Sequence, residues 1–144
     1  MTSSRLSNQS ILIWLSSVAF LIVCIVLVGG ITRLTGSGLS MVNWHPVMGI
    51  LPPLSESKWA DLFMKYQQFP EYQMLNKGMS LLDFKDIFFW EYLHRILGRI
   101  IGLALIVPYL FFWFTGRLDS SLKRAGALMI GLVVMQGLMG WYMV

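Results

Sequence analysis

The stretch ILIWLSSVAFLIVCIVLVGG, from Ile11 to Gly30, contains no charged residue. A helix needs roughly 20 predominantly apolar residues to cross a hydrocarbon layer of about 30 Å, and this run is long enough. Two further stretches, at about 87–114 and 125–144, are also long and apolar. A backbone in lipid must satisfy its own hydrogen bonds, and these runs are too long and too uniformly apolar for barrel strands. We therefore expect three transmembrane helices.

The composition of the whole chain agrees with this interpretation. Hydrophobic residues make up 56% of the 144 residues, and charged residues make up 12%. Soluble domains carry about 25% charged residues, so a soluble domain of this size is disfavoured. The sequence predicts an all-α integral membrane fold.

The lysine and arginine residues predict the orientation in the membrane. The connection 115–124 holds Arg117, Lys123 and Arg124, whereas the basic residues of 31–86 are spread thinly and offset by acidic ones. By the positive-inside rule, 115–124 and the N-terminus are expected to be cytoplasmic and 31–86 external. The net charge of +4 is then a topology signal, and we expect no nucleic-acid partner.

The N-terminal segment predicts the membrane in which the protein resides. The apolar run exceeds the core of about 7–15 residues in a secretory signal peptide, and no A-x-A-like site follows it, so we expect it to be retained. The preceding MTSSRLSNQS is too short for a typical organelle transit peptide. We expect the bacterial inner (plasma) membrane, with the mitochondrial inner membrane as the less favoured alternative.

The external connection 31–86 is predicted to be partly helical. An apolar stripe with the spacing i, i+3, i+4 and i+7 indicates an amphipathic helix that begins near Ser55 or Ser57. The stripe consists of Trp59, Leu62, Phe63 and Tyr66. The SLLD of Ser80–Asp83 fits a capping box, so a further helix is expected to begin there and run unbroken into the second span. The loop either covers a bound group or only shields helix ends, and both interpretations stay open.

A group of polar residues interrupts the second span, in WEYLHRILGR at Trp90–Arg99. With 3.6 residues per turn, one stripe of the helix carries Glu91, His94, Arg95 and Gly98, and Arg99 lies near its edge. Charged residues in a membrane span usually face a protein interior or a cavity and pair with one another. The stripe is therefore more typical of a functional site than of a lipid-facing surface.

Three kinds of site fit this stripe on the residues alone. A histidine beside glycines and arginines suits haem, because imidazole is a common axial ligand, glycine leaves room for the macrocycle and arginine can pair with propionates. A structural polar cluster and a proton or ion pathway remain the alternatives. We interpret His45, which precedes a proline, as a turn residue and Cys24 as a buried thiol without a disulfide partner.

Two blocks of the sequence resemble a known family. GGITRLTGSGLSMVNWHPVMGILPP at 29–53 and FPEYQMLNKGMSLLDFKDIFFWEYLHRILGR at 69–99 are similar to haem A synthase, of the type found in alphaproteobacteria and mitochondria. The resemblance implies an oxidoreductase that converts the ring methyl group of haem O to the formyl group of haem A. That product is needed for assembly of aa3-type cytochrome c oxidase.

The resemblance also implies roles for individual residues. Family members have eight transmembrane helices in two four-helix halves, and each half offers two histidines to a haem. His94 matches the first of these, as axial ligand of the haem iron, and Glu91 matches the catalytic glutamate of the E-x-x-H-R pattern. Arg95 and Arg99 are then expected to contact haem propionates and Gly98 to leave room for the ring. Haem b is the implied cofactor and haem O the implied substrate.

The sequence departs from the family in its extent. It stops at Val144, so we expect 1–144 to be the N-terminal part of a haem A synthase-like membrane domain, an incomplete four-helix half-bundle without the fourth helix and its histidine. Such a chain is expected to be inactive alone. We leave open whether it is a fragment or a natural truncation.

Two other functions remain as alternatives to the enzyme. They are a non-enzymatic membrane haem b electron carrier, in which Glu91 has no chemical task, and a haem-free assembly subunit, in which the stripe only joins helices. The partners that the enzyme implies are haem O, haem A, membrane lipid, haem O synthase and cytochrome oxidase assembly factors. A homo-oligomer is left open.

Overall fold

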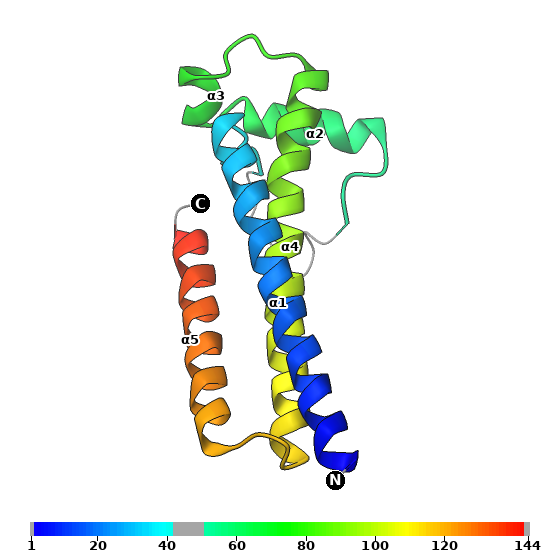
Figure 1. Cartoon of the computed structure of the whole chain (residues 1–144). Helices are drawn as coiled ribbons and strands as arrows, with labels where there is room; N and C mark the ends of the chain where they lie inside the picture. The colour runs from blue at the N-terminus through cyan, green and yellow to red at the C-terminus, as the bar shows by residue number, and fades with distance from the viewer. Residues whose placement is uncertain (1, 42–50, 143–144) are drawn as a thin grey trace. The chain divides into compact units, whose positions relative to one another are not determined.

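The computed structural model describes the backbone of residues 2–41 and 51–142, and the side chains from residue 8 within these ranges. All regular structure in these ranges is helical (Figure 1). In chain order the helices are α1 (Thr2–Leu34), α2 (Glu56–Tyr66), α3 (Pro70–Met74), α4 (Leu81–Phe114) and α5 (Ser120–Tyr142). The all-α fold predicted from the sequence is confirmed.

Three of these helices are long and apolar enough to cross a membrane. They supply the segments Asn8–Leu34, Leu81–Phe114 and Ser120–Tyr142. Each begins before the span expected from the apolar run alone, and the first also continues beyond Gly30. The helices exceed the apolar runs because polar residues beside a run can also adopt helical backbone. Each helix ends only where the backbone turns. After α1 that turn contains Gly36, with a φ of 61°.

Side-chain caps fix where three of the helices begin, and at α5 the cap is Asp119, whose Oδ1 accepts from the Leu122 amide at 2.7 Å. At α4, Ser80 Oγ accepts from the Asp83 amide at 3.2 Å, and the Ser80 amide donates back to Asp83 Oδ2 at 3.1 Å. This is the reciprocal pair of a capping box, as the sequence predicts. At α2, Ser55 is the N-cap, and its Oγ accepts from the Lys58 amide at 3.4 Å.

The chain divides into two compact units. Among the described residues, the first contains 2–25 and 97–142. Its core is apolar and consists of Ile11, Trp14, Val18, Leu105, Tyr109, Phe112 and Leu118. The polar groups of two aromatic side chains in this core donate hydrogen bonds to backbone carbonyls. Trp14 Nε1 donates to Ala104 O at 2.8 Å, and Tyr109 Oη donates to Lys123 O at 2.9 Å.

The second unit, Val26–Ile96, has an aromatic core built from α2, the start of α4 and the loops around them. The rings of Tyr66 and Phe84 stack with centroids 5.1 Å apart, and both side chains are fully buried. Tyr66 Oη accepts a hydrogen bond from Asn76 Nδ2 at 2.7 Å, while burial raises the pKa of its phenol. The other three members of the predicted stripe, Trp59, Leu62 and Phe63, pack against this core, which confirms the amphipathic helix.

Candidate functional site

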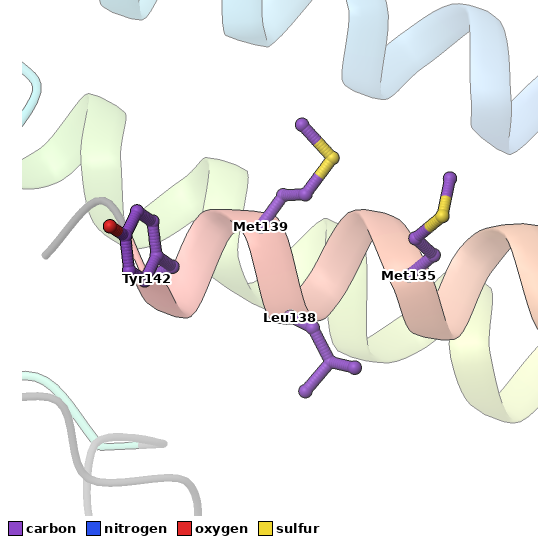
Figure 2. A pocket seen from close by; sticks show the side chains of 4 residues that line it. All are labelled: Met135, Leu138, Met139 and Tyr142. Carbon is purple, nitrogen blue, oxygen red and sulfur yellow. The ribbon is translucent and has the colours of Figure 1, made fainter.

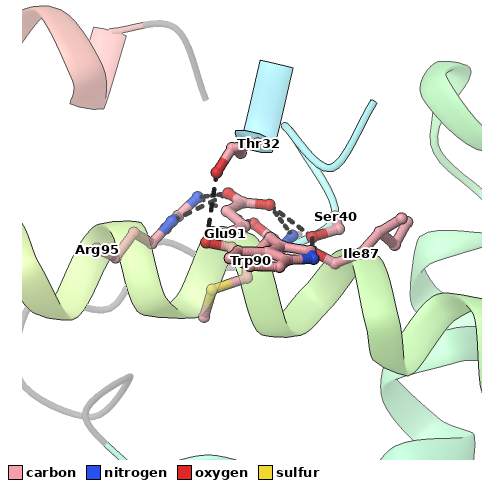
Figure 3. A network of polar contacts seen from close by, with 7 residues as sticks. Thr32, Ser40, Ile87, Trp90, Glu91 and Arg95 are labelled. Atoms are coloured by element: carbon pink, nitrogen blue, oxygen red, sulfur yellow. Dashed lines mark hydrogen bonds and ion pairs between the residues drawn. The ribbon is translucent and has the colours of Figure 1, made fainter. Parts of the chain in front are cut away.

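Glu91 is the centre of a buried polar network in the second unit (Figure 3). The residue is 5% exposed and lies on α4. Oε2 accepts from Ser40 Oγ at 2.6 Å and from the Met41 amide at 2.9 Å. Oε1 accepts from Arg95 Nε at 3.0 Å and from Arg95 Nη2 in a charge-assisted pair. Each carboxylate oxygen therefore has two donors.

The donors from Ser40 and Met41 are presented by the turn that follows α1. This turn, Gly36–Met41, contains Leu39 in the left-handed region with a φ of 63°. Such a backbone costs a residue with a side chain roughly 1–2 kcal/mol. It persists only where the surroundings determine it, and here the two residues that follow both bond to Glu91.

Thr32 fixes the end of α1 beside the same stretch of α4. Its Oγ1 donates to Val28 O, one helical turn back, at 2.8 Å and lies 3.4 Å from Trp90 O (Figure 3). The side chain is 8% exposed. The Thr32 hydroxyl thus lies beside the carbonyl of the residue before Glu91, while the Glu91 carboxylate is held by the following turn.

His94 lies one turn further along α4 and faces a glycine of α1. A Cβ built on Gly29 would lie 3.2 Å from His94 Nε2 and 3.5 Å from its Cδ2. A Cβ on the neighbouring Gly30 would meet nothing within 4 Å. The imidazole is partly exposed, and the missing side chain of Gly29 provides the space at its Nε2 edge.

The structure gives Arg95 a partner within the protein. Besides Glu91, its Nη2 reaches Met41 O at 3.5 Å, so the guanidinium joins the helix to the turn. The sequence predicts this residue as a propionate contact, and the ion pair with Glu91 occupies Nε and Nη2. The guanidinium retains further N–H groups for another acceptor.

Gly98 and Arg99 belong to the first unit. Within that unit a Cβ on Gly98 would lie 3.7 Å from Ile25 Cδ1, an ordinary packing distance. Arg99 Nη1 is buried and has no hydrogen-bond partner within the described ranges. An unsatisfied buried guanidinium nitrogen is costly, so Arg99 is suited to an acceptor such as a carboxylate.

Two other features do not add to this site. His45 lies outside the described residues. A hollow of about 280 Å³ on α5 is lined by Met135, Leu138, Met139 and Tyr142, none of which is a predicted site residue (Figure 2).

Sequence reasoning missed Gly29, Thr32 and Ser40. All three lie in or beside the GGITRLTGSGLS stretch, whose glycines and serines indicate turns but not their partners. Ser40 and Glu91 are 51 residues apart in the chain, and no periodicity within one helix can predict that contact.

Comparisons with known proteins agree with the resemblance. A family model described as cytochrome oxidase assembly protein matches residues 12–144. A haem A synthase of Rhodopseudomonas palustris is 52% identical over 136 residues, which are 94% of this chain and 38% of that protein. Haem A synthases of Flavobacterium psychrophilum and Chelativorans sp. are each 49% identical and cover 96% and 99% of the chain.

The matches cover nearly all of this chain but less than half of each relative. The chain spans 38%, 41% and 39% of the length of the three relatives. No solved structure matches it significantly. The family match extends from the first membrane-spanning helix through α5 and includes Glu91 and His94. The chain therefore belongs to the cytochrome oxidase assembly protein family.

Proposed function

We propose that this chain is the N-terminal part of a haem A synthase, an oxidoreductase that converts the ring methyl group of haem O to the formyl group of haem A. The observation that carries the proposal is that Glu91 and His94 lie on the same stripe of α4. Glu91 is a buried carboxylate with fixed orientation, and His94, three residues on, has an imidazole edge facing a glycine. The names of the relatives support the same activity.

The residues fit a haem by their chemistry. His94 would hold the haem iron through an imidazole nitrogen, and the lack of a side chain at Gly29 lets α1 approach that imidazole without displacing it. Arg99 Nη1, buried without a partner among the described residues, suits a propionate carboxylate, and Arg95 has N–H groups beyond those that bond to Glu91 and Met41. Gly98 and Arg99 enter the proposal through their spacing from His94 along the continuous helix α4. Haem b is the proposed cofactor and haem O the substrate.

A bound haem supplies the iron and the ring methyl group that is oxidised. The protein groups bind, orient and handle protons. Glu91 is held by donors from α4 and from the turn after α1, so its carboxylate cannot swing away. A carboxylate fixed in this way can act as a general base or stabilise positive charge that develops during oxidation.

The remaining proposals concern the setting of the enzyme. The density of basic residues in 115–124 supports a cytoplasmic N-terminus and an external α2 and α3. The bacterial inner membrane is the proposed location, with haem O synthase and cytochrome oxidase assembly factors as partners. The activity requires the rest of the protein, and the chain alone is proposed to be inactive.

The test uses a chimera in which this chain is completed by the remainder of the Rhodopseudomonas palustris relative. It is expressed in a bacterium that makes haem O but lacks its own haem A synthase, and extracted pigments are separated by chromatography. The intact chimera should yield haem A. Extracts that contain haem O but no haem A would contradict the synthase: haem B bound to the purified chimera would then leave the electron carrier possible, and a purified chimera without pigment would support the assembly subunit.

Two substitutions in the chimera separate the ligand from the proton-handling group. His94→Ala should reduce haem occupancy, because the iron loses an axial bond. Glu91→Gln keeps the size of the side chain and cannot ionise, so haem should bind while haem O or its alcohol accumulates. Loss of a positioned acid–base group typically costs about 10²–10⁴-fold in rate. Normal haem A levels in Glu91→Gln would contradict the role proposed for that carboxylate.

A further inference from the structure

The hydrogen bonds donated to Glu91 occupy the positions at which its carboxylate would take up a proton. An ionised carboxylate has about four acceptor positions. Among the described residues, Ser40 Oγ and the Met41 amide occupy those of Oε2, and Arg95 occupies those of Oε1. If the carboxylate takes up a proton, one of these donors must give way.

The groups that donate hydrogen bonds to Glu91 differ in whether they can also accept one. A backbone amide and a guanidinium can only donate hydrogen bonds, whereas a hydroxyl can donate one and accept two. Of the groups bonded to Glu91 within the described ranges, only Ser40 can therefore reverse its role. A proton on Oε2 could be donated to Ser40 Oγ, and the Ser40 hydroxyl would then need another acceptor.

Such an acceptor lies beside Ser40. The carbonyl oxygen of Ile87, one helical turn before Glu91, is 3.5 Å from Ser40 Oγ (Figure 3). Ser40 is 1% exposed, so water does not compete freely for the hydroxyl. Rotation about the Ser40 C–O bond can thus move its hydrogen from Glu91 Oε2 to Ile87 O without moving the backbone.

We propose that Ser40 is a positioning residue whose reversible hydroxyl lets Glu91 gain and lose a proton while remaining fixed between α4 and the turn after α1. No proton is transferred to Ser40. The acid proton stays bonded to Oε2, which donates a hydrogen bond to Ser40 Oγ. The Ser40 hydroxyl then donates its own hydrogen bond to Ile87 O. The inference rests on the proposed role of Glu91. It adds that the left-handed backbone of Leu39 serves to bring Ser40 and the Met41 amide to the carboxylate.

The test compares Ser40→Ala with Ser37→Ala in the chimera. Ser37 is a matched control, because it lies in the same turn and is fully buried, but its Oγ contacts Thr35 Oγ1 at 2.5 Å rather than Glu91. Thr35 Oγ1 also donates to Ile31 O at 2.8 Å, so it keeps a partner when Ser37 is replaced. Haem content, kcat, KM for haem O and the pigments that accumulate are measured for each variant.

Ser40→Ala should lower kcat about 10–100-fold, by analogy with the loss that follows removal of the outer partner that orients a metal ligand. Its haem content and KM should stay within about twofold of the parent, with haem O or the alcohol accumulating. Ser37→Ala should match the parent in all four measurements. Ser40→Cys, which replaces the hydroxyl with a somewhat larger thiol that forms weaker hydrogen bonds, should fall between the parent and Ser40→Ala.

Other outcomes would overturn the inference in distinguishable ways. If Ser40→Ala keeps its kcat while Glu91→Gln loses activity, the role of Glu91 stands and that of Ser40 is wrong. If Ser40→Ala loses haem together with activity, Ser40 serves folding rather than proton handling. If Glu91→Gln is fully active, the proposed role of Glu91 fails and the inference fails with it.

Discussion

His94 Nε2 faces the backbone of Gly29, so closely that a Cβ built there would stand 3.2 Å from the nitrogen. Nine in ten Cβ atoms in proteins keep a greater distance from their nearest neighbour than this. The imidazole would therefore have to move by a few tenths of an ångström. The position of the proposed haem ligand thus depends on a residue on another helix, 65 positions earlier in the chain (94 − 29).

Gly29→Ala should therefore weaken haem binding through His94. The added methyl group displaces the imidazole, and changes next to a metal ligand typically cost about 10–100-fold in affinity. Haem titration of the purified chimera, followed by absorption spectroscopy, measures the effect. Gly30→Ala is the control, because a Cβ there meets nothing within 4 Å. Equal affinities for the two variants would show that the Gly29 contact does not position the ligand.

Leu39→Gly should leave stability nearly unchanged or raise it. Leu39 adopts a left-handed φ of 63°, which glycine adopts without the steric cost of about 1–2 kcal/mol, and its side chain is 40% exposed. Leu39→Val should destabilise the protein, since β-branched residues tolerate this conformation least. Thermal unfolding in detergent, followed by circular dichroism, compares the two. A glycine variant as unstable as the valine variant would mean that the leucine side chain, not the backbone, determines the turn.

Gly126→Ala should destabilise the unit that contains α5. A Cβ on Gly126 would overlap the ring of Tyr109, which is 4% exposed and held by its hydrogen bond to Lys123 O. Overpacking of this kind costs about 1–3 kcal/mol. Gly131→Ala on the same helix meets nothing within 4 Å and should stabilise by roughly 0.5–1 kcal/mol through helix propensity. Opposite shifts in unfolding temperature are expected, and shifts of the same sign would argue against a rigid contact at Tyr109.

The chain alone and the chimera should differ in their haem spectra. With His94 as the histidine of the described spans, the isolated chain should bind haem weakly and with high-spin or mixed character. The chimera, which restores the remaining helices, should give six-coordinate low-spin spectra. A clean bis-histidine spectrum from the isolated chain would instead assign the second ligand to His45 or to another copy of the chain.

The sequence predicts the parts of this structure that depend on neighbouring residues. The apolar run from Ile11 identifies a membrane helix, the Ser80–Asp83 pair marks the start of α4, and the stripe that ends at Tyr66 predicts α2. In each case the residues that form the pattern belong to the same helix, or the same helix start, that the pattern predicts. The helix ends were harder to predict because hydropathy measures burial in lipid and does not register the polar turns that extend a helix.

The candidate site could be predicted only in part, for the same reason. The spacing of Glu91 and Arg95 predicts their contact, because residues four apart meet on a helix. The hydrogen bond from Ser40 and the approach of Gly29 to His94 join distant segments. They depend on how α1 and its turn pack against α4 within this unit, and the sequence contains no local sign of that.

The ion pair between Glu91 and Arg95 also bears on how the protein enters the bilayer. A charged residue at the centre of a helix costs roughly 2.5–3.5 kcal/mol during insertion by the translocon. Both partners lie on α4, four residues apart, so the counterion of Glu91 forms with the helix itself. The emerging segment can therefore present the two charges as a neutral pair, and its insertion does not require the hydrogen bonds of Glu91 with Ser40 and Met41 to have formed.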